Sequence, residues 1–333
     1  MHLKALVAAL TLLSLGLVAA CSGGGPGAGP TVVRFGHTLT EESSWQVGAE
    51  KFAEIIEEET DGRYTVEIFA NGQLASGNQR KAIEMLRQGS YDVDITSGLI
   101  WSSFDETLSI TALPWILPTF DEVEGIINGE GGELVLDALG ENGVTPVGIG
   151  GTGYRQMLNN TRPIEGPDDL AGLKMRVPGT PLFLDLYRAL GADPVEMDFT
   201  EVYTALQQGT IDGMEAVADV AVTNNFYETA DYISLTNYNY DFFFTTFSND
   251  FYEGLTSEDQ EIFMEAGREA TAEATAHGQA AEEEAISTLE AEMEVYTPTE
   301  DEIEEFIAAM APVYEKFRDE FSPELREVFG YPE

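Results

Sequence analysis

The chain has 333 residues, and its 60 acidic against 16 basic side chains give a formal net charge of −44. This charge excludes nucleic acid and anionic lipid surfaces as electrostatic partners, because both require a basic face. The hydrophobic share of 43% is ordinary for a globular protein and too high for a disordered one. Many acids with few lysines are typical of a halophilic protein, whose self-repulsion is screened beyond ~3 Å at about 1 M salt.

The first 30 residues predict export and lipid attachment. Lys4 is followed by an apolar stretch at 5–20 that ends in small residues directly before Cys21, as in a bacterial lipobox. We therefore expect a signal peptide at 1–20, lipidation of Cys21 and a flexible Gly/Pro tether at 21–30. No later segment is long and apolar enough to span a bilayer, so we expect lipid anchoring at the outer face of the cytoplasmic membrane or in the periplasm.

Two cycles of alternating strands and helices follow the tether. The first contains strands at 31–36, 64–69 and 92–95 and helices at 44–59 and 79–88. The second begins near 147–150 and contains a strand at 174–177 and helices at 180–190 and 199–208. This alternation predicts parallel pairing within each of two similar α/β lobes.

The chain from Ser257 onward is predicted to be mainly helical. Ser257 and Gln260 resemble a capping box that opens a helix reaching to about residue 294. Such a helix is long enough to extend across both lobes, with Gly267 and Gly278 as positions where it could bend. A last helix is predicted at about 300–321.

The segment 169–178, DLAGLKMRVP, resembles the signature of the DctP family of solute-binding proteins of tripartite (TRAP) transporters. Further matches occur in the same order and cover most of the chain after the tether: FGH at 35–37, NGQL at 71–74, GYRQM at 153–157, RPI at 162–164, LGADPV at 190–195, FTEVYTALQQG at 199–209, IDGME at 211–215 and FYE at 226–228.

This resemblance implies two α/β lobes joined by hinge strands, with a long carboxyl-terminal helix spanning both lobes and a ligand in the cleft between them. Lobe 1 would comprise 31–152 with about 241–280, and lobe 2 would comprise 153–240 with about 281–333. The implied function is to bind a small organic carboxylate and deliver it to the membrane permease subunits of the transporter.

Arg176 is the residue expected to anchor the ligand, because it lies at the end of a predicted strand and a guanidinium can hold a carboxylate with two parallel hydrogen bonds. The resemblance assigns Arg155 to a second polar contact or to orienting the site. Glu215 aligns with a glutamate near the family's cleft, where it can accept hydrogen bonds from ligand hydroxyls, hold Arg176 or Arg155, or help to bind a cation.

Other residues are expected to complete the cleft. Phe199 and Trp101 are candidate apolar walls, and Thr38 is a candidate hydroxyl contact. Ser97 lies in the region of lobe 1 where some relatives carry acidic and basic side chains that contact the ligand. Ala216 departs from the Asn or Trp that many relatives carry there. This departure, together with the charged partners missing from lobe 1, argues against a sialic-acid-type ligand. It favours a monocarboxylate or an aromatic or hydrophobic acid over a sugar acid.

Other functions remain open from the sequence. A sensor subunit that presents the same ligand to a receptor kinase would have an identical site. An enzyme is disfavoured, because only His37 and His277 follow the leader and no phosphate loop or dinucleotide fingerprint is present, although paired carboxylates are not excluded. A calcium-binding surface protein is ranked last, since the chain has no Asp-x-Asp-x-Asp-Gly loop. We expect no metal site and no cofactor.

Overall fold

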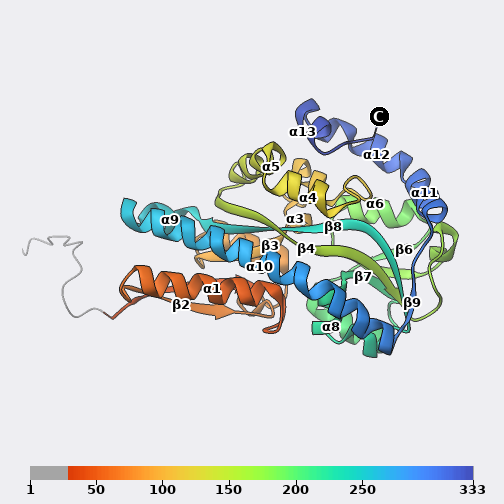
Figure 1. The fold of residues 1–333 in the computed structure, drawn as a ribbon, viewed down its shortest axis with the longest axis horizontal. Helices are drawn as coiled ribbons and strands as arrows, with labels where there is room; N and C mark the ends of the chain where they lie inside the picture. The colour runs from red at the N-terminus through yellow and green to blue at the C-terminus, as the bar shows by residue number, and fades with distance from the viewer. Residues whose placement is uncertain (1–28, 333) are drawn as a thin grey trace, which may run out of the picture.

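The computed structural model describes residues 29–332, so the predicted signal peptide, Cys21 and most of the tether lie outside the described residues. The described chain forms one mixed sheet of nine strands surrounded by helices (Figure 1). The strand order is β2-β1-β3-β8-β4-β7-β5-β6, and β9 pairs with β8 outside this path. The α/β fold class is therefore confirmed.

Lobe 1 contains the first predicted cycle. Its strands β1 (Thr31–His37), β2 (Tyr64–Phe69) and β3 (Val93–Ser97) pair in parallel, as expected. Helices α1 (Ser44–Glu59) and α2 (Gln79–Arg87) connect them, and the side chains of Ser43 and Asn78 cap their first turns. Lobe 1 also contains elements that the sequence did not predict: η1 (Gln73–Ala75), α3 (Gly98–Trp101), η2 (Glu106–Ala112), α4 (Phe120–Ile127) and α5 (Glu130–Gly140).

Lobe 2 contains the second cycle. Strand β5 (Lys174–Val177) has the predicted bounds and pairs in parallel with β6 (Asp193–Glu196) and β7 (Gly213–Val217). The helical elements of this lobe are η3 (Pro167–Leu170), α6 (Pro181–Ala189), η4 (Phe199–Glu201), α7 (Val202–Gln207), α8 (Ala218–Thr223) and η5 (Phe226–Glu228).

Two long antiparallel strands join the lobes. Strand β8 (Tyr232–Ser248) pairs with β3 through its second half, and β4 (Val144–Asn159) pairs with β7 through its second half. Their mutual register shifts at three places along the crossing. Neighbouring residues of β4, Met157 and Leu158, belong to different hydrophobic clusters, because successive side chains of a strand point to opposite faces.

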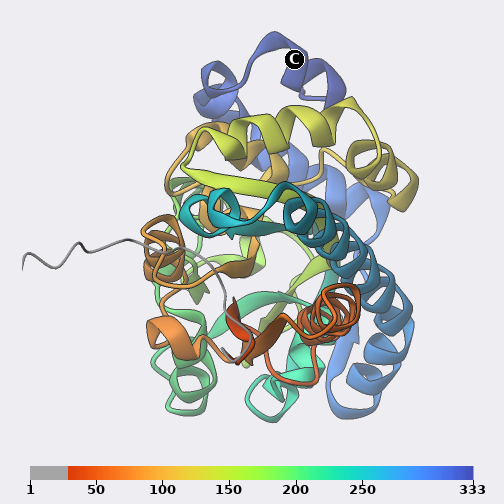
Figure 2. The same ribbon diagram turned by 90° about the vertical axis from the view of Figure 1, so that its left-hand side faces the viewer.

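Helix α10 (Ser257–Glu292) has 36 residues, which corresponds to a length of about 54 Å. It packs against α1 in lobe 1 and α8 in lobe 2 (Figures 1 and 2). The predicted capping box is wrong by one residue, because Thr256 is the cap and accepts from the backbone N–H of Asp259. Gly267 and Gly278 permit close packing: an added Cβ would lie 2.4 Å from Val147 and 2.9 Å from a Thr152 backbone oxygen.

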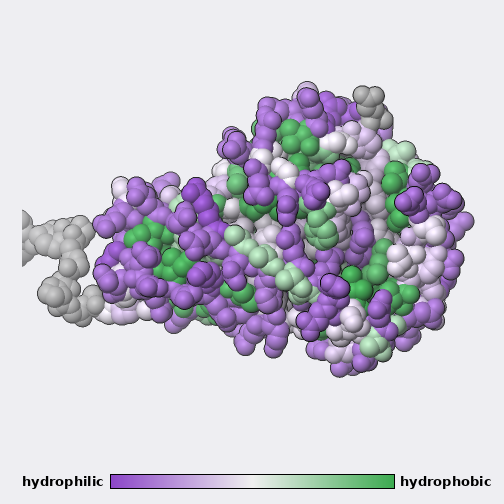
Figure 3. All heavy atoms as spheres, viewed as in Figure 1, coloured by the Kyte–Doolittle hydropathy of each residue, from purple (hydrophilic) through white to green (hydrophobic). Residues whose placement is uncertain are grey.

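The remaining segments flank α10. Helix α9 (Asn249–Gly254) precedes it and β9 (Glu294–Tyr296) follows it. The single helix predicted at 300–321 is wrong. The chain instead forms α11 (Glu300–Ala309), α12 (Ala311–Phe317), η6 (Arg318–Glu320) and α13 (Pro323–Val328). Pro312 explains the first break, since proline has no N–H to donate to the preceding turn. Hydrophilic residues cover most of the face seen in Figure 3.

Candidate functional site

An inner cavity of ≈40 Å³ lies where the two lobes and the crossing strands meet. Its lining combines charged, polar and apolar side chains from both lobes: Leu39, Trp45, Gln79, Ser97, Leu99, Ile100, Arg155, Arg176, Pro178, Phe199, Glu215, Ala216, Val217, Val220 and Asp241. Six of the eight ligand-binding residues predicted from the sequence are among them. The carboxyl ends of β3, β5 and β7 contribute Ser97, Arg176 and Val217, as the general rule for ligand sites in α/β sheets expects.

Arg176 is 3% exposed and lies near the end of β5. Its Nε donates to the backbone oxygen of Met197 at 3.0 Å, and its Nη1 lies 3.7 Å from Glu215 Oε1. Within residues 29–332, neither Nη atom makes a hydrogen bond. Burial is the main cause that lowers the pKa of Arg176 to about 10, so this side chain is still a cation at neutral pH.

Arg155 is held between two carboxylates. Its Nη1 pairs with Glu215 Oε2, and its Nη2 lies 2.8 Å from Asp241 Oδ1. Burial acts to lower the pKa of Arg155, but the two carboxylates outweigh it and hold the pKa well above its usual value. Arg155 is therefore a permanent cation whose two terminal nitrogens are already occupied by protein groups.

Two hydroxyl groups complete this network. Tyr238 donates to Glu215 Oε2 at 3.1 Å, and Ser97 donates to Asp241 Oδ1 at 2.7 Å. These bonds fix the orientation of both carboxylates. Glu215 and Asp241 are 1% and 7% exposed, so neither charge is dispersed by solvent and the pairing with arginine is required.

The position of Arg155 depends on an irregularity of the crossing strands. Gly151 pairs with Phe242 and Tyr154 with Tyr240, so Thr152 and Gly153 together lie opposite Asp241. Gly153 has φ +146°, a backbone conformation that is readily available only to glycine. This bulge re-aims the side chains that follow it, and it brings Arg155 and Asp241 into contact.

Apolar side chains enclose the rest of the inner cavity. The ring of Phe199 lies 5.8 Å from the guanidinium carbon of Arg176, within the range of a cation–π contact. Trp45 forms a further wall from α1, and Ala216 leaves a smooth surface on β7. These walls favour a ligand with a compact apolar body.

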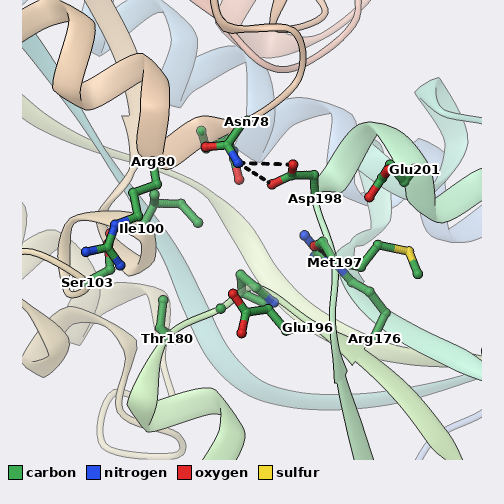
Figure 4. A pocket seen from close by; sticks show the side chains of 13 residues that line it. Asn78, Arg80, Ile100, Ser103, Arg176, Thr180, Glu196, Met197, Asp198 and Glu201 are labelled. Carbon is green, nitrogen blue, oxygen red and sulfur yellow. Dashed lines mark hydrogen bonds between the residues drawn. The ribbon is translucent and has the colours of Figure 1, made fainter.

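An outer cavity of ≈420 Å³ adjoins the inner one and shares Gln79, Ile100, Arg176 and Pro178 with it. Figure 4 shows the lobe 1 residues Asn78, Arg80, Ile100 and Ser103 on one side of this cavity. The residues of lobe 2 lie opposite and include three acids: Arg176, Thr180, Glu196, Met197, Asp198 and Glu201. Asn78 Nδ2 donates to both oxygens of Asp198 at 3.1 Å and so connects the two lobes.

Two predicted site residues do not line either cavity. Trp101 is fully buried in a hydrophobic cluster, where its ring lies 6.1 Å from that of Phe104. Thr38 is buried beside Leu39, which does line the inner cavity. Three residues that line the cavities were not predicted from the sequence: Asp241, Trp45 and Arg80. Asp241 is the only acid in the apolar run at 238–244, and this isolation was a signal that could have identified it.

Within residues 29–332, no group of three or more His, Cys, Asp or Glu side chains is placed to hold a metal ion. In the same range, no helix has the length and apolar character that a membrane crossing requires.

Comparisons with known proteins agree with the fold. Residues 35–320 match the family described as bacterial extracellular solute-binding protein, family 7 (DctP). A solute-binding protein of Roseobacter denitrificans is 33% identical over 256 residues, which cover 77% of this chain and 78% of that protein.

Two solved structures are similar over nearly their whole length. A TRAP periplasmic solute-binding protein of Polaromonas, bound to D-erythronate, is 28% identical with a TM-score of 0.85, covering 91% of this chain and 99% of that one. A TRAP periplasmic solute-binding protein of Shewanella oneidensis, with bound succinate, is 26% identical with a TM-score of 0.86, covering 90% and 98%.

Proposed function

Because this chain belongs to family 7 of the bacterial extracellular solute-binding proteins, we propose that its inner cavity captures a small organic carboxylate for a TRAP transporter. The relatives are named for solute binding, and the similar solved structures contain carboxylates. This function is binding and delivery without chemical change of the ligand.

The observation that carries the proposal is that Arg176 is buried and has two terminal nitrogens available to a ligand. Its guanidinium is buried, fixed through Nε by Met197 and free of hydrogen bonds at both Nη atoms in the described structure. A carboxylate in the inner cavity would supply two acceptors to these atoms. Charge-assisted bidentate pairs of this kind are among the strongest hydrogen bonds in proteins. Arg155 and Glu215 hold the site in shape around that contact.

We place the hinge of lobe closure at the bulge of Thr152 and Gly153 opposite Asp241. This position coincides with the lobe boundaries expected from the sequence, at 152/153 and 240/241. The irregular pairing there supports this placement, because fewer ladder hydrogen bonds resist rotation of one lobe against the other.

The test is a binding assay on the tether-free protein with a panel of organic acids. Thermal unfolding and titration calorimetry would be measured for the wild type, Arg176→Lys and Arg176→Gln. At 100 times its Kd a ligand adds about 2.7 kcal/mol of stability, which raises the melting temperature by several degrees. We expect both variants to lose most of this shift, since lysine keeps the charge but not the planar fork.

Arg188→Gln is the matched control, because Arg188 lies in the same lobe with its side chain 60% exposed. Its ligand-induced shift should equal that of the wild type. Undiminished binding by both Arg176 variants would overturn the assignment of the anchor. The absence of binding by any organic acid would overturn the function itself.

Delivery and membrane attachment are further parts of the proposal. The family's role in transport supports a partnership with membrane permease subunits. The lipobox-like sequence before Cys21 supports a lipid anchor. Mass spectrometry of the mature amino terminus would test the anchor: we expect a diacylated Cys21, and an unmodified terminus cleaved elsewhere would contradict it.

A further inference from the structure

The four ionisable side chains around the inner cavity balance in charge. Arg155 and Arg176 carry two positive charges, and Glu215 and Asp241 carry two negative ones. All four are largely buried, so dissolved salt screens them little. A ligand that brought only a carboxylate would therefore leave one negative charge without compensation in a dry site.

Two acceptor atoms of the cavity also make no hydrogen bond in the described structure, although Glu215 Oε1 lies 3.7 Å from Arg176 Nη1. Glu215 Oε1 is buried without a hydrogen bond in the described structure. Both hydrogen bonds of Asp241 use Oδ1, and none among the described residues reaches Oδ2. A buried carboxylate oxygen is nearly always hydrogen-bonded, so the donor missing at Glu215 Oε1 is expected to come from the ligand, which can also reach Oδ2 of Asp241.

The outer cavity does not supply the missing positive charge. It adds Arg80 but also three acids, Glu196, Asp198 and Glu201. A second carboxylate extending from the inner cavity would therefore approach an acidic surface. This arrangement disfavours dicarboxylates and favours a ligand that carries a cation beside its carboxylate.

We propose that the ligand is a small zwitterion, with a carboxylate on Arg176 and a protonated nitrogen that donates to Glu215 and Asp241. This proposal rests on the function proposed above and specifies the class of carboxylate. The two acids bind the two terminal nitrogens of the same guanidinium, and Glu215 lies 3.7 Å from Arg176. Such closely spaced charges match the spacing within an amino acid. A volume of ≈40 Å³ holds about three water molecules, which limits the apolar body to a few carbon atoms.

The experiment compares zwitterions with acids in which a hydroxyl group replaces the ammonium group. Glycine, alanine and β-alanine would be titrated by calorimetry against their hydroxy counterparts glycolate, lactate and 3-hydroxypropionate, and against succinate as a dicarboxylate, with the wild type and Asp241→Asn. We expect at least one zwitterion to bind the wild type ten or more times tighter than its hydroxy counterpart. Asp241→Asn leaves the site with a net positive charge, and we expect it to reverse that preference.

Glu57→Gln is the control for loss of an acidic side chain, because Glu57 is exposed on α1. This variant should prefer zwitterions over hydroxy acids as strongly as the wild type does. Ser97→Ala keeps the charge of Asp241 while removing one donor, so it should retain the preference for zwitterions.

Arg176-dependent binding of the hydroxy acids or succinate without binding of any zwitterion would overturn this inference and leave the proposed function standing. A preference that Asp241→Asn does not change would also overturn it. Binding of no carboxylate in either set would overturn the proposed function.

Discussion

The side-chain carboxyl group of Asp94 is buried in β3, outside the ligand site. Tyr91 donates to its Oδ1 at 2.8 Å, and its Oδ2 has no partner in the described structure. Burial raises the pKa of Asp94 to about 7, although the hydrogen bond from Tyr91 opposes this change. The protonated form is therefore the one that the fold stabilises.

This raised pKa predicts how stability depends on pH. Unfolded Asp94 titrates near 3.8, so its stabilising contribution is complete below about pH 4 and is lost as pH rises through about 7. Asp94→Asn cannot ionise. We expect its stability relative to the wild type to rise between pH 4 and 7, at no more than about 1.4 kcal/mol per pH unit. Urea unfolding of both proteins across this range measures the difference.

Asp137→Asn provides the comparison for this measurement, because Asp137 is exposed on α5. Its stability should follow the wild-type pH profile throughout. If Asp94→Asn followed that profile as well, the buried carboxyl group would not be the origin of the pH dependence.

The sequence predicted individual site residues where a family motif marks them. Arg176 and Glu215 stand in such motifs, and both line the inner cavity. Asp241 was missed because its aromatic neighbours from Tyr238 to Phe244 are typical of a core strand; its isolation among them marks it as unusual, and the pairing with Arg155 in the fold shows its role. Trp101 was expected to form an apolar wall of the cleft, but the short helix α3 places it in a hydrophobic core cluster.

At the scale of elements, the contact between α1 and α10 depends on small residues. A Cβ added to Gly48 would lie 2.7 Å from the backbone oxygen of Ala270 and 2.9 Å from the Cβ of Ala274. Backbone atoms of a helix cannot move aside cheaply. We therefore expect Gly48→Ala to destabilise the protein by about 1–3 kcal/mol, measured by chemical unfolding.

The opposite effect is expected at Gly125 in α4, where an added Cβ would meet nothing within 4 Å. Alanine there restricts the unfolded chain and favours the helix, so Gly125→Ala should stabilise by about 0.5–1 kcal/mol. Equal effects of the two substitutions would show that helix propensity, and not the approach of α1 to α10, determines the result.

Elements with a clear hydrophobic period were predicted well, and those governed by tertiary packing were not. Helix α1 and strand β5 have their predicted bounds, because spacing and caps are local signals. Strand β8 was missed, since it is buried on both faces through its second half and so shows no alternation. The break at Pro312 was overlooked inside a longer helical pattern.

At the scale of the whole molecule, a polar contact holds the lobes together across the outer cavity. Asn78 donates to Asp198 of the opposite lobe (Figure 4). Its Oδ1 also caps α2 by accepting from the backbone N–H of Lys81. Serine retains the capping function but is too short to reach Asp198. We expect Asn78→Ser to weaken ligand binding about tenfold, equivalent to about 1.4 kcal/mol, by favouring the open state.

Small-angle scattering and unfolding distinguish this effect from damage to the fold. The ligand-free variant should have a larger radius of gyration than the wild type, with an unchanged unfolding midpoint. A lower unfolding midpoint with unchanged dimensions would instead indicate a structural role for Asn78.

The net charge of −44 affects how a ligand approaches the protein. The protein repels an anion over about one Debye length, which falls from about 8 Å at physiological salt to ~3 Å at about 1 M. A zwitterion has no net charge and is not repelled in this way. Inside the cavity, Arg176 is shielded from salt, so the bound state changes little. The association rate of an anionic acid should therefore rise with ionic strength, and that of an amino acid should stay nearly constant.

Trp45 lines the cavity and provides a fluorescence signal for stopped-flow measurement. An association rate that fell with salt for the anion would show that local positive potential at the cleft outweighs the charge of the whole molecule.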